Sequence, residues 1–117
     1  MQARSERRVV ITGLGVVSPL AVDVPQFWQR LTAGESGIHD LTTLDTSKYK
    51  VHFGGDIPDF DVTGVVDHRE AKRLDRFTQF AVHAAEQAIS DAAIDFSALD
   101  RHMCGVILGS GIGGLGE

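Results

Sequence analysis

The sequence has little of what marks several special classes of protein. It contains one cysteine, so no disulfide can form within the chain, which favours a reducing compartment. No apolar run approaches the ~20 residues that a membrane-spanning helix needs. The start of the chain leads straight into a β-branched run, unlike a secretory signal peptide. These absences predict a cytoplasmic protein that makes no contact with a membrane.

Positive charge is also scarce. With 11 Lys and Arg against 16 Asp and Glu, the formal net charge is −5, which argues against nucleic-acid binding because that function needs a basic balance. The sequence contains no P-loop motif, and its histidines lack the paired spacing of metal ligands, so we expect no metal site. The 43% hydrophobic and 23% charged residues are typical of a globular protein.

Two short apolar runs have the pattern of buried parallel strands. Residues 9–12 are β-branched and end at Gly13, and residues 104–108 end at a glycine-rich loop. Strands of this kind need further strands beside them and helices on both faces of the sheet. The other predicted elements cannot supply these neighbours. We therefore expect an α/β chain that forms the opening portion of a larger domain.

A first helix is predicted after Asp23. This residue and Gln26 have the spacing of a capping box, Pro25 is tolerated in a first turn, and Gly34 is a plausible end of the helix. The stripe that this helix would bury comprises Phe27, Trp28 and Leu31.

The strongest helical pattern runs over residues 67–93. Its apolar surface is wider than a single stripe, so we expect neighbours on more than one side, and its alanines would allow them to approach closely. One face of a continuous helix would also carry four cations at positions i, i+3, i+4 and i+7. That face could bind an acidic partner, or it could be a solvated surface with intrahelical ion pairs. The cations are Arg69, Lys72, Arg73 and Arg76.

The glycine-rich loop, residues 109–114, satisfies the spacing G-x-G-x-x-G. A dinucleotide site would also need a following helix, a second strand and an acidic residue ~20 positions further on, so the match is a weak indication. Cys104 begins the apolar run, and His102 would lie on the same strand face. We interpret Cys104 as a small buried hydrophobic residue and not as a nucleophile.

Several segments, taken together and in their order, resemble the N-terminal part of a β-ketoacyl-(acyl carrier protein) synthase of the type II, fatty-acid-condensing kind. They cover nearly all of this chain but only the front part of the family's length. The segments are Val9-Val-Ile-Thr-Gly-Leu-Gly-Val-Val-Ser-Pro19, Gly34-Glu-Ser-Gly-Ile38, Phe53-Gly-Gly-Asp-Ile-Pro-Asp-Phe60, Lys72-Arg-Leu-Asp-Arg-Phe77 and Gly105-Val-Ile-Leu-Gly-Ser-Gly-Ile-Gly-Gly-Leu115.

The resemblance implies a thiolase-like layered αβαβα fold, of which residues 1–117 would be an incomplete N-terminal part. It further implies a homodimer that needs no cofactor. The implied activity is decarboxylative Claisen condensation of a cysteine-bound acyl chain with malonyl-acyl carrier protein. In the family the nucleophilic cysteine and two catalytic histidines lie beyond the position of Glu117, so Cys104 does not correspond to the nucleophile. This stretch alone is therefore expected to be inactive.

Residue roles follow from the same resemblance. The family's contact with its acidic carrier protein falls on Arg69, Lys72 and Arg73, and the side chain that gates the depth of the acyl pocket matches Ile112. Two alternatives stay open at this point. The protein could be a polyketide-type ketosynthase or its non-catalytic chain-length partner, or the glycine loop could belong to a nucleotide-binding module.

Overall fold

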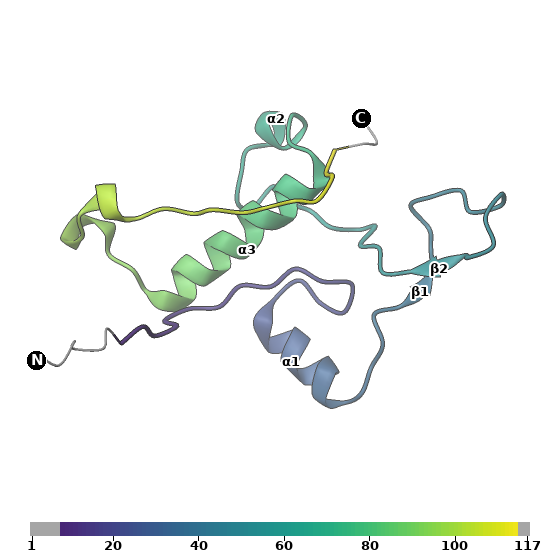
Figure 1. Cartoon of the computed structure of the whole chain (residues 1–117), viewed down its shortest axis with the longest axis horizontal. Coiled ribbons are helices and arrows are strands. Elements are labelled where there is room, and N and C mark those ends of the chain that lie inside the picture. The colour runs from purple at the N-terminus through teal and green to yellow at the C-terminus, as the bar shows by residue number, and fades with distance from the viewer. Residues whose placement is uncertain (1–7, 115–117) are drawn as a thin grey trace, which may run out of the picture.

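The computed structural model describes residues 8–114. Its elements are α1 (Val24–Thr32), β1 (His39–Asp40), β2 (Phe53–Gly54), α2 (His68–Ala71) and α3 (Arg76–Ala92), followed by two turns of 3₁₀ helix, η1 (Phe96–Ala98) and η2 (Arg101–Met103) (Figure 1). The two strands pair antiparallel, with His39 opposite Gly54 and Asp40 opposite Phe53. Among the described residues no helix is long and apolar enough to cross a membrane.

The molecule has an open shape. The radius of gyration is 18.3 Å, whereas a compact domain of this length would have about 13 Å. Few side chains are buried among the described residues, and they cluster in two places. They are Leu20, Ala21, Phe60, Val62 and Ala71. The chain therefore has a small core beneath α2 and leaves most of its apolar surface uncovered.

The strands predicted at 9–12 and 104–108 do not form. Both segments run without ladder hydrogen bonds, and Val9 and Ile107 are 92% and 98% exposed. A strand is held by hydrogen bonds to a neighbouring strand, and no strand lies beside either segment in the described part of the chain. The prediction that these runs are buried is wrong for this chain. The sequence pattern also implied that these runs need further strands as neighbours. Their exposure is consistent with that requirement, because no such strands lie beside them among the described residues.

Helix α1 begins and ends where the sequence predicted. The Asp23 carboxylate accepts a hydrogen bond from the Gln26 backbone N–H at 2.9 Å, which caps the first turn. At the other end Gly34 has a φ of 73°, and the N–H groups of Gly34 and Glu35 donate to the carbonyls of Leu31 and Arg30. This pair of bonds is a Schellman motif, which needs a residue in the left-handed region and so favours glycine.

The predicted buried stripe of α1 is wrong in this chain. Trp28 and Leu31 are 64% and 46% exposed, and Phe27 is half-buried. No described element packs over this side of the helix, so its apolar side chains face outward. The periodicity identified the helix correctly, but periodicity alone cannot supply the partner that buries a face.

The helix predicted over 67–93 is two helices with a break. The Asp67 carboxylate caps α2 by accepting from the N–H groups of Arg69 and Glu70 at 2.7 and 3.0 Å. Before α3 the backbone of Asp75 has a ψ of 151°, which no helix interior adopts. The four cations therefore do not share one helix face, and that prediction is corrected.

Helix α3 is covered on more than one side, as its composition predicted. On one side the backbone of residues 13–15 passes directly over the alanines at positions 84, 88 and 92. A Cβ at Gly13 would lie 2.2 Å from the Ala88 carbonyl oxygen, and a Cβ at Gly15 would lie 1.8 Å from that of Ala84. Glycine is required here because no side chain fits between the two backbones.

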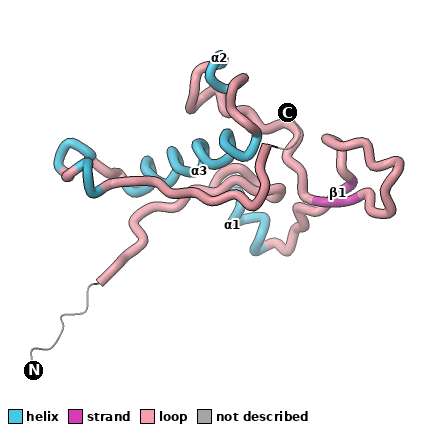
Figure 2. Tube along the Cα trace, turned by 45° about the horizontal axis from the view of Figure 1, so that its top comes forward, coloured by secondary structure: helices cyan, strands magenta, loops and turns pink. Residues whose placement is uncertain are grey.

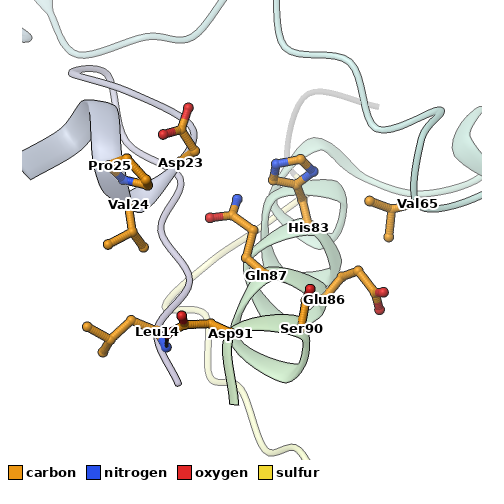
Figure 3. Close-up of a pocket in the computed structure, with 10 residues that line it drawn as sticks. All are labelled: Leu14, Asp23, Val24, Pro25, Val65, His83, Glu86, Gln87, Ser90 and Asp91. Atoms are coloured by element: carbon orange, nitrogen blue, oxygen red, sulfur yellow. Dashed lines mark hydrogen bonds between the residues drawn. The ribbon is translucent and has the colours of Figure 1, made fainter. Parts of the chain in front are cut away.

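Polar side chains of α3 fix the same contact. The Asp91 carboxylate accepts from the Leu14 N–H at 2.9 Å, and the Gln87 amide donates to the carbonyl of Val22 at 2.6 Å. These two side chains help to line a pocket between α3 and the segment that leads into α1 (Figure 3). Its volume is about 460 Å³. The Gly13-Leu-Gly15 sequence thus serves helix packing in this structure.

We predict that Gly15→Ala destabilises the protein by about 3 kcal/mol, because the added methyl group must displace helix backbone and not a flexible side chain. Urea unfolding of the intact protein measures the change. Gly64→Ala is the matched control, since a Cβ at Gly64 meets nothing within 4 Å. Equal stability of the two variants would contradict the packing argument.

Hydrogen bonds to the Asp56 side chain hold the long loop between α1 and α2. Asp56, whose side chain is 10% exposed, pairs with the imidazole of His39. It also accepts hydrogen bonds from the Thr42 and Thr43 N–H groups at 3.1 and 2.9 Å. Burial alone would raise the pKa of Asp56. The hydrogen bonds from Thr43, Thr42 and His39 outweigh burial and hold that pKa well below its ordinary value.

A carboxylate with a lowered folded-state pKa stabilises the fold above its unfolded pKa of about 3.9 and loses that contribution as the pH falls. We therefore predict that Asp56→Asn lowers the thermal midpoint at pH 7, and that its difference from the wild type shrinks as the pH falls below about 4. Asp59→Asn is the control, because the Asp59 side chain accepts no hydrogen bond from the described residues. A pH-independent difference for Asp56→Asn would refute the role of ionisation.

Candidate functional site

Three exposed cations gather where α2 ends. Arg69 lies in α2, Lys72 follows as its C-cap, and Arg73 lies in the connection to α3. We call these three residues the basic turn. Within residues 8–114 the ion pairs are Arg30–Glu35 and His39–Asp56, so none of the three cations has a carboxylate within 4.0 Å. The intrahelical ion pairs of the solvated-face alternative are therefore absent here, and the binding of an acidic partner by these cations stays a prediction.

The fourth predicted cation, Arg76, turns away from the basic turn. Its guanidinium donates to the carbonyls of Ile57 and Phe60 at 2.6 and 2.8 Å. It also lies 5.2 Å from the ring centroids of both Phe60 and Phe80. Arg76 is therefore a partly buried structural residue, held by carbonyl dipoles and aromatic faces, and it does not contribute a free charge to the surface.

The basic turn rests on the best-packed part of the chain. Phe60, Val62 and Ala71 form the buried cluster beneath α2, and Phe80 of α3 packs against it in an edge-on contact with Phe60 at 4.9 Å between centroids. The Asp67 cap fixes the start of α2, and the same backbone hydrogen bonds from Glu70 and Arg69 lower the pKa of Asp67. The cations are thus exposed side chains on an ordered backbone.

The glycine-rich loop returns to the same end of α3. Figures 1 and 2 both show the C-terminal stretch running alongside α3 toward the helix start near α2. A Cβ at Gly113 would lie 2.8 Å from Cε1 of Phe77, and a Cβ at Gly114 would lie 2.7 Å from Oδ2 of Asp75. Both glycines have positive φ, at 50° and 65°. The loop therefore packs against the start of α3, the helix that directly follows the basic turn.

An apolar groove of about 580 Å³ runs between α3 and the incoming C-terminal stretch. Its walls come from α3 on one side and from residues 106–110 on the other. Ile112, the predicted gate, is 74% exposed and does not line this groove, so its role stays a prediction. Among the residues that line the groove are Phe77, Ala81, Val82, Ala85, Val106 and Leu108.

Cys104 differs from its prediction. The thiol is exposed, and its Sγ donates weakly to the Asp100 carbonyl at 3.5 Å, so the interpretation as a buried hydrophobic residue is wrong in this chain. His102 lies in η2 and not on a shared strand face. Among the described residues, no group of three or more His, Cys, Asp or Glu side chains is placed to hold a metal ion.

Sequence reasoning missed two residues that shape this site. Gln79 donates to the carbonyls of Ala71 and Leu74 at the α2–α3 break. Arg76, which the sequence analysis placed among the four surface cations, donates to carbonyls of the loop at 57–60. A polar residue inside a predicted helix gives no signal of such a role, because its partners are set by where the helix breaks. The contact of the glycine loop with the start of α3 was also not visible, since the two are far apart along the chain.

With this geometry in place, comparison with known proteins identifies the family. The chain matches the family described as "Beta-ketoacyl synthase, N-terminal domain" over residues 6–117. The protein therefore belongs to the β-ketoacyl synthases, as the sequence motifs indicated, and the described elements are a fragment of the N-terminal domain of that thiolase-like family.

Individual relatives agree with this assignment. The chain is 46% identical over 110 residues to the 3-oxoacyl-[acyl-carrier-protein] synthase 2 of Synechocystis sp.. The aligned region covers 94% of this chain and 26% of that protein. It is 43% identical over 109 residues to the protein of the same name from Staphylococcus aureus strain COL, with 93% and 26% covered. The chain thus spans about a quarter of the length of the curated relatives that it matches.

Among solved structures, the chain is similar to the ishigamide ketosynthase/chain length factor. The TM-score is 0.73 at 34% sequence identity, and the match covers 81% of this chain and 24% of that one. The backbone described above is therefore a recognisable part of a ketosynthase fold, although residues 9–12 and 104–108 form no strands in it.

Proposed function

We propose that this chain forms the front part of an elongating 3-oxoacyl-(acyl carrier protein) synthase of fatty-acid synthesis. The curated relatives with that name support the proposal through 46% and 43% identity over nearly the whole chain. The observation that carries the carrier-protein part is the basic turn, three exposed cations without carboxylate partners among the described residues.

The proposed reaction has two stages in the intact enzyme. A cysteine thiolate attacks the acyl thioester and releases the carrier's thiol, which leaves the acyl chain on the enzyme. Malonyl-carrier protein then loses carbon dioxide, and the resulting carbanion attacks the enzyme thioester and expels the cysteine thiolate. Two histidines stabilise the oxyanion that forms on decarboxylation. The part of this machinery that we assign to the chain is carrier recognition and one wall of the acyl site.

The basic turn suits an acidic carrier protein. Electrostatic complementarity speeds association and fixes orientation, and both effects weaken as salt screens the charges. The net charge of the chain is −5, so a local basic surface would direct an acidic partner to this one place. We extend the proposal to a homodimeric assembly in the cytoplasm, as the family resemblance implies.

A second candidate is a polyketide-type ketosynthase or its non-catalytic chain-length partner. The observation that favours it is the similarity to the ishigamide ketosynthase/chain length factor, with a TM-score of 0.73. The candidates differ in chemistry: a non-catalytic partner releases no carbon dioxide from malonyl-carrier protein on its own, whereas a condensing enzyme forms a carbon–carbon bond.

We predict that the intact protein converts acyl- and malonyl-carrier protein to a 3-oxoacyl thioester, and that Lys72→Glu raises the KM for the carrier-bound acyl donor about tenfold. Charge reversal at the basic turn replaces attraction by repulsion. The KM should also rise with salt, and the rate with a carrier-free acyl thioester should stay within about twofold of the wild type.

Lys50→Glu is the control for this prediction, since it makes the same charge change at an exposed lysine in the loop between β1 and β2. A salt-independent KM, or equal effects of the two variants, would count against the basic turn as the carrier site. The absence of any condensation by the wild type, together with intact carrier binding, would favour the non-catalytic partner.

A separate prediction concerns Ile112. We expect Ile112→Phe to shorten the acyl chains that the intact enzyme accepts, because a larger side chain at a gating position reduces the pocket volume. Competition between short and long acyl-carrier substrates measures the preference. Ile112→Val is the matched control with a smaller side chain, and identical product lengths for all three proteins would remove the gating role.

A further inference from the structure

The backbone that carries Lys72 and Arg73 is held at both ends by one side chain. The Nε2 amide of Gln79 donates to the Ala71 carbonyl at 3.0 Å and to the Leu74 carbonyl at 2.9 Å. These two carbonyls lie immediately before Lys72 and immediately after Arg73. Gln79, which lies in the first turn of α3, therefore binds the backbone on both sides of Lys72 and Arg73.

Gln79 is in turn linked to Arg76. The Nη1 group of Arg76 donates to Oε1 of Gln79 at 3.4 Å, which places the Gln79 amide with its donor nitrogen toward the carbonyls. The other Arg76 bonds tie this pair to the carbonyls of Ile57 and Phe60. The result is a polar network that joins the loop at 57–60, the basic turn and the first turn of α3.

The network replaces hydrogen bonds that the break between α2 and α3 removes. In a continuous helix, backbone N–H groups four residues further on would satisfy the carbonyls of Ala71 and Leu74. Here the extended backbone at Asp75 interrupts that pattern. The Ala71 carbonyl keeps one backbone donor, the Leu74 N–H at 3.3 Å. The Gln79 amide gives this carbonyl a second donor and also donates to the Leu74 carbonyl. The basic turn has no ion pair to order it among the described residues. Its geometry rests on the backbone bonds from Arg73 to Glu70 and from Leu74 to Ala71, together with these side-chain bonds.

We infer that Gln79 and Arg76 are positioning residues for carrier-protein recognition: they hold the basic turn in the shape that the acidic carrier meets. The inference rests on the proposed function of the basic turn. Its physical basis is preorganisation, since a backbone that is already ordered loses less conformational entropy when its cations dock. Both side chains are partly buried, so the role we infer is exerted through the backbone that carries the cations.

The decisive variant is Gln79→Met, which keeps the length and approximate shape of the side chain but removes both donor hydrogens. In the intact protein we expect the Kd for the acyl carrier protein, measured by titration calorimetry, to rise about fivefold to tenfold. That change corresponds to the net contribution of about one hydrogen bond. The rate with a carrier-free acyl thioester should stay within about twofold of the wild type.

Gln29→Met is the matched control, because Gln29 is an exposed glutamine on α1, away from the basic turn. Should Gln79→Met fail to fold, Arg76→Lys provides the second test. It keeps the positive charge, but a single ammonium cannot reproduce the forked contact with two carbonyls and two aromatic rings. We expect Arg76→Lys to weaken carrier binding at least threefold, with kcat on the carrier-free thioester preserved.

The outcomes separate this inference from the proposed function. If Lys72→Glu weakens carrier binding while Gln79→Met and Arg76→Lys do not, the positioning role is wrong and the carrier site stands. If Lys72→Glu also leaves binding unchanged, the carrier site itself is wrong and both proposals are lost. Equal losses on carrier-bound and carrier-free substrates in the Gln79 and Arg76 variants would indicate a general structural role and would overturn the inference.

Discussion

The close contact between the backbone of residues 13–15 and the alanine face of α3 is the constraint on which the rest of the described structure depends. It holds the segment before α1 against the last turns of α3. The Asp91 side chain accepts from the Leu14 N–H there, and the Gln87 side chain donates to the Val22 carbonyl. The contact is possible only between glycine and alanine backbones, since a Cβ on Gly15 would lie 1.8 Å from a carbonyl oxygen. With α3 fixed in this way, a neighbouring face of the helix receives residues 106–110.

The two ends of α3 have different tasks. Its C-terminal half supports the extended segment that leads into α1, whereas its first turn collects the features that we connect with function. Gln79 binds the carbonyls that flank Lys72 and Arg73 there, and Arg76 donates to Gln79. Gly113 and Gly114 pack against Phe77 and Asp75. A surface that could meet an acidic carrier and a loop that could border an acyl chain are thus supported by the same turn of helix.

Exposure of apolar residues has a simple explanation in this chain. Trp28 of α1, Val9 and Ile107 are all more than half exposed, and each belongs to a segment that the sequence pattern predicts to be buried. The chain spans about a quarter of the length of its curated relatives. An apolar pattern records that a face is suited to burial, but burial itself requires a neighbouring layer. The prediction of burial is therefore wrong for these segments in this chain, although the pattern identified their apolar character.

The sequence by itself determined the local features, because these depend on residues close together in the chain. The Asp23 cap, the left-handed Gly34 at the end of α1 and the motifs of the synthase family are of this kind. Only the tertiary structure decided the break between α2 and α3, the inward turn of Arg76 and the contact of the glycine loop with the start of α3. The last two depend on carbonyls or backbone contributed by distant segments, and the break is accompanied by side-chain contacts of Gln79 to Ala71 and Leu74. Helical periodicity carries no information about such partners.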